Sequence, residues 1–245
     1  MLENVTSYTS NEDMIASAYD LIATLARESI EERGVFSLAL SGGSTPRALF
    51  ERFRDNSGEQ FLPWRDVHIF WGDERCVPPD DNDSNYRMAN DAFISSIAIP
   101  DSNVHRMRGE ISPGEGAALY SMEMELFFGR SASSAAGFPE FDLILLGLGP
   151  DGHTASIFPE SVAETEVAHP VIATEASPGI EPKDRITLTF PVLNNARNVL
   201  FLVAGESKRN VLESVSGDTR ESSPYPSAKV NPRGNLYWYW AHGPR

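Results

Sequence analysis

The 245-residue chain has a single cysteine, few cations and no long apolar run. Because Cys76 has no second cysteine to pair with, no disulfide can form within the chain, and a reducing compartment is expected. No segment reaches the roughly 18 apolar residues of a membrane-spanning helix. The N-terminus lacks the basic start and apolar run of a secretory signal. These absences predict a cytoplasmic protein with no membrane partner.

Positive charge is also scarce: 20 Lys and Arg residues face 35 Asp and Glu residues, which leaves a formal net charge of −15. Such a chain repels nucleic-acid phosphates, so nucleic acid is not an expected partner. If the substrate is itself an anion, a local cluster of cations has to overcome this field. The sequence has no H-E-x-x-H motif and no paired Cys/His ligands, which argues against a zinc site. It also lacks the G-x-S-x-G elbow of a serine hydrolase.

Short apolar segments alternate with amphipathic ones along the chain. Strands are predicted over residues 35–40, 67–71, 141–146, 171–174, 186–190 and 199–204, and the aromatic run 236–240 is typical of a packed strand or a subunit contact. Helices are predicted from a cap at Asn11 to a stop at Gly34, from Pro46 onward, and over 86–97, 117–128 and 208–215. Apolar strands separated by helices indicate a parallel sheet covered on both faces. The predicted fold class is α/β: one three-layer, Rossmann-like domain over residues 1–245, with a mostly parallel sheet and helices on both faces.

In a parallel sheet the ligand site lies at the carboxyl ends of the strands, and the first such loop here is glycine-rich. Residues 41–46 read SGGSTP and lead into a helix whose free N–H groups and positive dipole end favour an anion such as phosphate. An ordinary tight turn with a Ser/Thr helix cap accounts for the SGGSTP sequence equally well. The candidate anion-binding residues are Ser41, Gly42, Gly43, Ser44 and Thr45.

A second glycine-rich loop, residues 147–156 (GLGPDGHTAS), follows the strongest predicted strand. It formally matches G-x-G-x-x-G, and Glu175 lies at a suitable distance for a dinucleotide ribose. The Phe158-Pro159 pair leaves little room for the helix that a pyrophosphate needs, so a nicotinamide site is disfavoured. His153 follows three glycines and an aspartate in this loop, a setting that favours acid–base work over a structural role, with Asp151 orienting the imidazole.

Three cationic residues lie at the ends of other predicted strands. Residues 72–75 (GDER) place Asp73 and Arg75 directly after a strand, and residues 84–86 add a further polar wall. Arg185 begins a later strand, and Lys208 follows the strand 199–204. Each of these is most often a solvated surface charge. Together, the three cations could form the cluster that an anionic substrate requires.

Taken in order, six segments resemble the 6-phosphogluconolactonase family, which shares a superfamily with glucosamine-6-phosphate deaminase and ribose-5-phosphate isomerase. They are SGGSTP, FWGDERCVP with SNYR after it, NVHR, FDLILLGLGPDGHTASIFP, RITLTFPVLNNA and FLVAGESK, and they span nearly the whole chain. The resemblance implies hydrolysis of 6-phospho-D-glucono-1,5-lactone to 6-phosphogluconate in the oxidative pentose phosphate pathway. It implies no metal and no organic cofactor, and the chain is expected to be a monomer or a homodimer.

Carried over residue by residue, the resemblance makes His153 the general base that activates water. It places Gly43, Ser44, Thr45, Arg75 and Lys208 around the 6-phosphate. Asp151 and Asp73 then serve the base or the sugar hydroxyls. The oxyanion is stabilised either by loop N–H groups or by Arg75, and the sequence does not choose between them.

Two functions compete with this reading. The amino-sugar phosphate deaminase carries Asn-Glu just before the proline of its corresponding loop, where this chain has Ile157 and Phe158. A sugar-phosphate sensor that kept the pocket but lost catalysis would not need His153 and Asp151. One departure from the family is the C-terminal Trp238-Tyr239-Trp240-Ala241, where relatives often have Trp-x-x-Asp, and it puts the terminal contacts in doubt.

Overall fold

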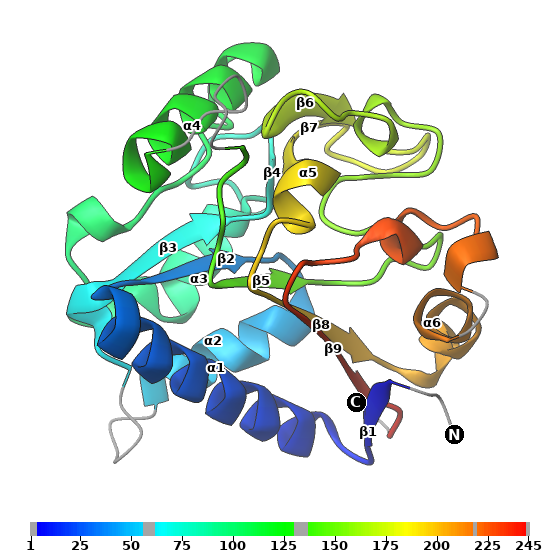
Figure 1. The fold of residues 1–245 in the computed structure, drawn as a ribbon. Coiled ribbons are helices and arrows are strands. Elements are labelled where there is room, and N and C mark those ends of the chain that lie inside the picture. The colour runs from blue at the N-terminus through cyan, green and yellow to red at the C-terminus, as the bar shows by residue number, and fades with distance from the viewer. Residues whose placement is uncertain (1–3, 56–61, 130–136, 218–219, 244–245) are drawn as a thin grey trace.

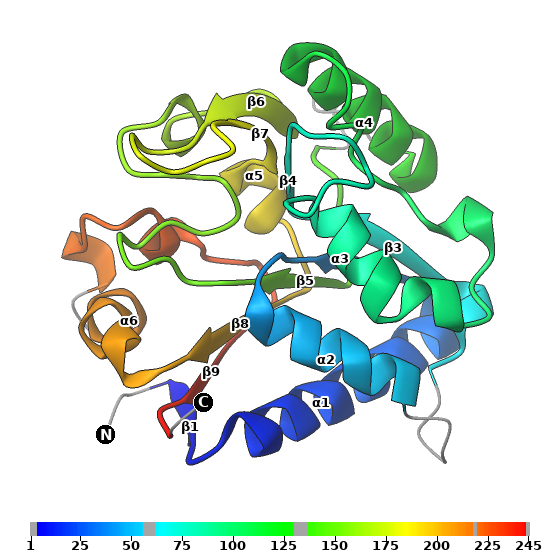
Figure 2. The same cartoon turned by 180° about the vertical axis from the view of Figure 1, so that it is seen from behind.

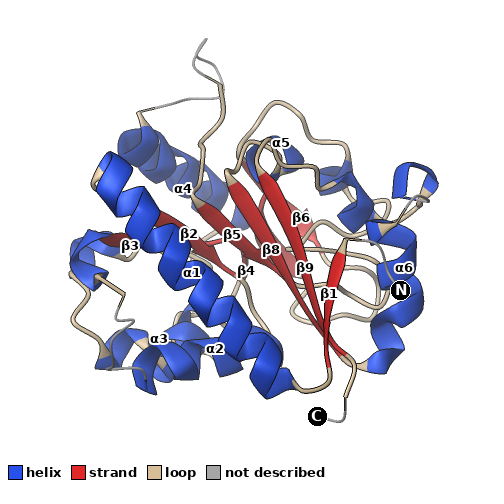
Figure 3. Cartoon of the chain, turned by 60° about the horizontal axis from the view of Figure 1, so that its bottom comes forward, coloured by secondary structure: helices blue, strands red, loops and turns tan. Residues whose placement is uncertain are grey.

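The computed structural model describes residues 4–55, 62–129, 137–217 and 220–243. Its centre is a six-stranded sheet in the order β1-β9-β8-β5-β2-β3, in which every neighbouring pair is parallel (Figure 3). The strands are β1 (Val5–Tyr8), β2 (Phe36–Leu40), β3 (Val67–Trp71), β5 (Leu143–Leu146), β8 (Asn198–Ala204) and β9 (Asn235–Ala241). The mostly parallel α/β class is confirmed, and the aromatic C-terminal run forms β9, inside this sheet.

The two faces of the central sheet are covered differently (Figures 1 and 2). Three helices pack on one face with a buried aliphatic and aromatic cluster beneath them: α1 (Asn11–Arg33), α2 (Ser44–Asp55) and α3 (Asn85–Ala92). The other face carries a second buried cluster beneath a small sheet and three more helices: α4 (Pro113–Phe128), α5 (Phe190–Leu193) and α6 (Arg209–Ser216). No helix in the described ranges is both long and apolar enough to cross a membrane.

The first helix shows how the local sequence sets an element's limits. The side chain of Ser10 accepts a hydrogen bond from the backbone N–H of Asp13, so the cap lies one residue before the predicted Asn11. Gly34 ends the helix at φ 78°, a left-handed conformation that favours glycine, as predicted. Between them, buried residues such as Met14 and Ala18 recur at helical spacing and face the central sheet.

The later strands form a second, antiparallel sheet that the sequence did not separate from the mostly parallel one. β6 (Val171–Glu175) and β7 (Asp184–Leu188) pair antiparallel with each other, and β7 pairs antiparallel with β4 (Asp73–Arg75). Only residues 176–183 join β6 to β7, and the backbone N–H of Ala176 donates to the carbonyl of Lys183 at 2.8 Å to close that loop. A parallel pair needs a crossover of a dozen or more residues, so this short connection requires a hairpin.

The predicted edge of the sheet does gather the distinctive loops. Because β2, β3, β5 and β8 run parallel, the segments that follow them all emerge at one edge. These are the loop before α2, the turn into β4, the glycine-rich loop 147–156, and residues 205–208. The small antiparallel sheet adds β7 to this edge, because β4 directly follows β3 and pairs with β7.

Candidate active site

A cavity of about 300 Å³ lies at the carboxyl edge of the central sheet. Its walls come from the loop after β2, from β4 and β7, from the start of α3 and from the loop after β5. The predicted site residues that line it are Ser41, Gly42, Gly43, Asp73, Arg75, His153 and Arg185. The structure therefore brings the proposed base and two of the three proposed cations to one place.

His153 is oriented by Asp151 within the glycine-rich loop. Nδ1 of the imidazole lies 2.5 Å from Oδ1 of Asp151, and the same oxygen accepts the backbone N–H of His153 at 3.2 Å. Burial alone would raise the pKa of Asp151, but the charge and hydrogen bonds of His153 outweigh it and hold that pKa below its usual value. With Nδ1 donating to the carboxylate, Nε2 is left to accept a proton from a ligand.

The loop around His153 depends on close backbone approach. A Cβ on Gly149 would come within 2.1 Å of Nδ1 of His153, so only glycine leaves room for the ring where it stands. Gly152 has φ +76°, and a Cβ there would meet the ring of Tyr225. The other side of the imidazole packs on Phe158, with 4.4 Å between ring centroids. The imidazole is thus held by its carboxylate partner, by the backbone and by an aromatic ring.

In the described stretch 147–161 no α-helix follows β5. The turn from Thr154 to Ile157 is closed instead by a backbone hydrogen bond of 2.9 Å. A dinucleotide fingerprint requires a helix N-terminus at this point to receive the pyrophosphate. The nicotinamide alternative therefore loses its binding element.

Two arginines stand directly opposite each other on β4 and β7. The antiparallel register pairs Arg75 with Arg185, which puts both side chains on the same face of the small sheet. Arg185 is only 4% exposed. Burial lowers its pKa and repulsion from Arg75 lowers it further, while the negative charge of Asp73 raises it. Within the described residues neither guanidinium forms an ion pair with a carboxylate. Like charges that face each other destabilise a strand pair, so an anion bound in the cavity would reduce the repulsion between Arg75 and Arg185.

Each of the two guanidiniums is held by a carbonyl. Nη1 of Arg75 donates to the carbonyl of Asp83 at 2.6 Å, and Nε of Arg185 donates to the carbonyl of Pro182 at 2.7 Å. Nε of Arg75 is buried and has no hydrogen-bond partner in the described structure. These contacts fix the direction of the positive charge and leave further N–H donors for a ligand.

Asp73 is a buried wall of the cavity. Its carboxylate accepts hydrogen bonds from the hydroxyl of Ser156 at 2.6 Å and from Nδ2 of Asn85 at 3.4 Å. Nδ2 of Asn85 also donates to the carbonyl of Asp73 at 2.9 Å. The carboxylate therefore connects β4 with both the glycine-rich loop and α3.

The remaining predicted residues do not line the cavity. Ser44 and Thr45 are the first residues of α2, directly after Gly43. Lys208 ends a short 3₁₀ turn, Glu206–Lys208, after β8. Its proposed contact with the phosphate stays a prediction.

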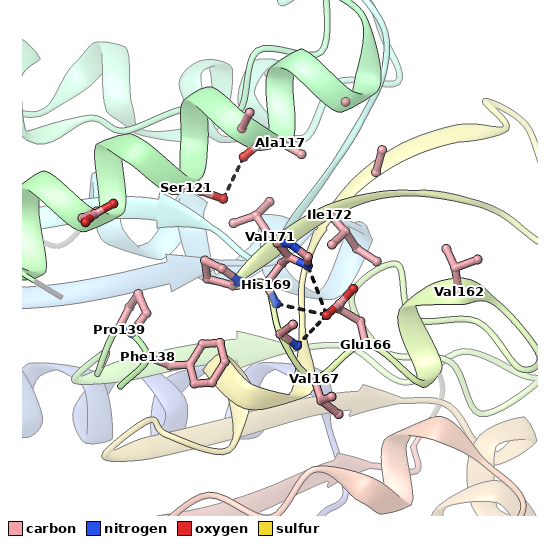
Figure 4. Close-up of a pocket in the computed structure, with 16 residues that line it drawn as sticks. Ala117, Ser121, Phe138, Pro139, Val162, Glu166, Val167, His169, Val171 and Ile172 are labelled. Atoms are coloured by element: carbon pink, nitrogen blue, oxygen red, sulfur yellow. Dashed lines mark hydrogen bonds and ion pairs between the residues drawn. The ribbon is translucent and has the colours of Figure 1, made fainter. Parts of the chain in front are cut away.

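A larger cavity, about 1020 Å³, lies between α4 and β6 (Figure 4). Its walls are mainly apolar, as at Phe138 and Ile172. Its histidine, His169, is 69% exposed and lies 3.3 Å from Glu166, in an ordinary surface pair. Its lining within the described ranges includes no Lys or Arg, so it is a poor site for an anion. Among the described residues, no group of three His, Cys, Asp or Glu side chains is placed to hold a metal ion.

The model of the family described as glucosamine-6-phosphate isomerases/6-phosphogluconolactonase matches residues 9–238. The chain belongs to this family. It is 40% identical over 239 residues to the 6-phosphogluconolactonase of Synechocystis, covering 97% of this chain and 95% of that protein. The Nostoc 6-phosphogluconolactonase is 41% identical, with 92% and 90% covered. The solved structure of the 6-phosphogluconolactonase from Trypanosoma cruzi has a TM-score of 0.85 at 32% identity, covering 97% of this chain and 94% of that one.

The two positions before Pro159 are those where the sequence resemblance expects the Asn-Glu of a deaminase. Ile157 is fully buried, and Phe158 is 2% exposed and packed on the imidazole. An aromatic ring therefore occupies the place where the sequence comparison expects the carboxylate of a deaminase. Neither of these two positions in this family member carries a carboxylate.

Sequence reasoning missed three features of this family member's site. The sequence marked Phe158 as a position that disfavours a helix and lacks a carboxylate, but it did not predict that this ring packs directly on His153. The loop 176–183 contributes Ile180 and Glu181 to the cavity wall, and no sequence signal set it apart from other surface loops. The direct opposition of Arg75 and Arg185 was also out of reach, because it depends on the register of strands that are far apart in the chain.

Proposed function

We propose that this protein hydrolyses 6-phospho-D-glucono-1,5-lactone to 6-phosphogluconate, the second step of the oxidative pentose phosphate pathway. One observation carries the proposal: an imidazole–carboxylate pair and two opposed arginines line or adjoin the same cavity in a chain with a net charge of −15. The family supports it, as do relatives named 6-phosphogluconolactonase at about 40% identity.

In the proposed complex, the 6-phosphate of the substrate binds at the end of the cavity that carries Arg75 and Arg185. Arg75 and Arg185 present planar N–H donors that suit phosphate oxygens. Gly42 and Gly43 allow the backbone to approach closely beside them. With the phosphate anchored there, the lactone ring extends toward His153, which sets C1 near the base.

In the reaction His153 takes a proton from water through Nε2 as the water oxygen forms a bond to C1. Asp151 holds the imidazole in this tautomer and stabilises the imidazolium that forms. The carbonyl carbon becomes tetrahedral, and because Arg75 is assigned to the phosphate, its oxyanion is stabilised by loop N–H groups. The bond from C1 to the ring oxygen then breaks, and His153 returns its proton to that oxygen. The product is the open-chain acid, and the base is ready for another turnover.

The cysteine count and the net charge of the chain support a cytoplasmic location for this reaction. The single cysteine fits a reducing compartment and the negative charge disfavours nucleic acid, so we place the enzyme in the cytoplasm as a single domain. Its substrate is the sugar phosphate lactone, and no metal or organic cofactor takes part in the proposed steps. Whether the chain acts as a monomer or a homodimer does not alter the chemistry, because one chain supplies every residue assigned a role.

The proposal is tested by proton release from freshly prepared 6-phosphogluconolactone, corrected for spontaneous opening. We expect saturable turnover that falls strongly when the phosphate is absent from the substrate. Ammonia release from glucosamine-6-phosphate would identify a deaminase instead. Phosphate-dependent binding of 6-phosphogluconate with no turnover would identify a sensor.

A further inference from the structure

Glu74 lies between two residues of the proposed site yet does not line the cavity. Neighbouring side chains on a strand point to opposite faces, so Glu74 turns away from the face that carries Asp73 and Arg75. It is 2% exposed, and no cation among the described residues forms an ion pair with it. A buried carboxylate is costly unless its oxygens are fully hydrogen-bonded, so this one needs an explanation.

Four donors converge on the Glu74 carboxylate. Oε1 accepts the backbone N–H groups of Arg75 at 2.8 Å and Asn85 at 2.7 Å. Oε2 accepts the hydroxyl of Ser84 at 3.0 Å and the backbone N–H of Tyr86 at 2.8 Å. Three of these donors belong to the N-cap and first turn of α3, which lies beside β4 (Figure 2). The carboxylate therefore ties the start of α3 to the strand that carries the site.

The segment that Glu74 ties down makes direct contact with the site. The carbonyl of Asp83, one residue before Ser84, accepts the hydrogen bond from Nη1 of Arg75 at 2.6 Å. Asn85 lines the cavity and donates from Nδ2 to Asp73. Its amide also lies against the loop after β2, because a Cβ on Gly42 would come within 2.0 Å of Oδ1. Residues 83–85 thus set the positions of one arginine and one carboxylate.

We propose that Glu74 is a positioning residue whose buried carboxylate anchors residues 83–86 and thereby aims the Arg75 guanidinium and the Asp73 carboxylate into the cavity. Burial raises the pKa of Glu74, and the N–H donors of Asn85, Tyr86 and Arg75 oppose that rise. The charged form suits this arrangement, since a carboxylate accepts from all four donors and a protonated acid loses one acceptor lone pair.

The test is Glu74→Gln, which keeps the shape of the side chain but replaces one carboxylate oxygen with an NH₂ group. That group faces hydrogen-bond donors and cannot accept from them. This role rests on the proposed function, so its kinetic readout is kcat and KM for 6-phosphogluconolactone and for unphosphorylated gluconolactone. We expect KM for the phosphorylated lactone to rise about 10-fold or more, with kcat changed by less. The preference for the phosphorylated substrate should shrink, a change that general loss of stability does not produce. Glu74→Asp, which restores the charge, should recover part of that preference.

Two further variants keep the test decisive. Glu110→Gln is the matched control, because Glu110 pairs with Arg106 at 2.7 and 2.8 Å and is not among the described residues that line the cavity. If Glu74→Gln does not fold, Ser84→Ala removes a single donor to Glu74, and we expect a smaller rise in KM of the same kind. Unchanged KM and unchanged phosphate preference in a folded Glu74→Gln or Ser84→Ala protein would overturn the role.

A binding measurement separates this inference from the proposed function. Calorimetric titration with 6-phosphogluconate needs no turnover, and we expect weaker binding to Glu74→Gln than to the unmodified protein or to Glu110→Gln. If the unmodified protein hydrolyses no lactone, the proposed function fails, while a loss of affinity in Glu74→Gln alone still supports the positioning role. Equal affinities in all three proteins contradict it.

Discussion

Replacing Gly149 with alanine perturbs the proposed catalytic imidazole of His153 through one added methyl group. The new Cβ would come within 2.1 Å of Nδ1 and 2.4 Å of Cε1 of His153, and 2.6 Å of Oδ1 of Asp151. Ordinary contact begins near 3.4 Å, so the ring must withdraw by about 1.3 Å or the loop must open. The backbone conformation of Gly149 is one that alanine can adopt, since its φ is not positive. The ring therefore shifts while the fold is kept.

A displacement of about 1 Å at a reacting group can cost roughly 10²-fold in rate, and we expect kcat of Gly149→Ala to fall by about that factor. The arginine end of the cavity is untouched, so KM should change by less than about threefold. The assay is proton release from 6-phosphogluconolactone, with a thermal melt to confirm folding. Gly114→Ala is the control, because its added Cβ meets nothing within 4 Å. A Gly149→Ala enzyme with normal kcat would refute the placement of the imidazole in the reaction.

Two other predictions concern binding and stability. Arg185→Ala removes a hydrogen-bonding cation from the cavity wall, worth about 1.5–3 kcal/mol, so KM for the phosphorylated lactone should rise about 10- to 150-fold in steady-state kinetics. Lys208→Ala, at the third proposed cation, should also raise this KM, and an unchanged KM would remove Lys208 from the proposed site. His68 lies 3.0 Å from His105, and burial, then repulsion from His105, lowers its pKa from 6.5 to about 4. Between pH 6.5 and 4, His68 is protonated in the unfolded chain but neutral in the folded one, so protonation favours unfolding. The free energy of unfolding is therefore unaffected by His68 above pH 6.5 and decreases as the pH falls toward 4. In urea melts at pH 7.5 and 5, His68→Asn should lose less stability on acidification than the unmodified protein, and an equal loss would contradict this assignment.

The central architecture was predictable because its signals are local. The strand β3 matches its predicted bounds, and α1 ends at the predicted glycine. Strands that are buried on both faces show continuous apolar runs, and residues 141–146 are a clear example. The loops at the carboxyl edge could be placed before any coordinates, since parallel strands put them at one side of the sheet. His153 and Asp151 were found for the same reason.

The features that sequence reasoning missed depend on contacts between distant segments. β4 is only three residues long and follows β3 after Gly72, so nothing local marks it as a separate strand. The pairing of Arg75 with Arg185 follows from register across 110 positions. Glu74 was part of a charged tetrapeptide, and only the fold shows that α3 returns to cover it. Periodicity reveals burial and element type, but it carries no information about which strands pair.

The central claim is that an imidazole acts as general base at one end of a cavity whose other end holds phosphate. The most direct measurement is kcat for His153→Gln on fresh 6-phosphogluconolactone, corrected for spontaneous opening, beside calorimetric affinity for 6-phosphogluconate. We expect kcat to fall by about 10²–10⁴-fold, the usual contribution of a positioned base, with affinity for the product kept within about threefold. Turnover that stays within threefold of the unmodified enzyme would contradict the account.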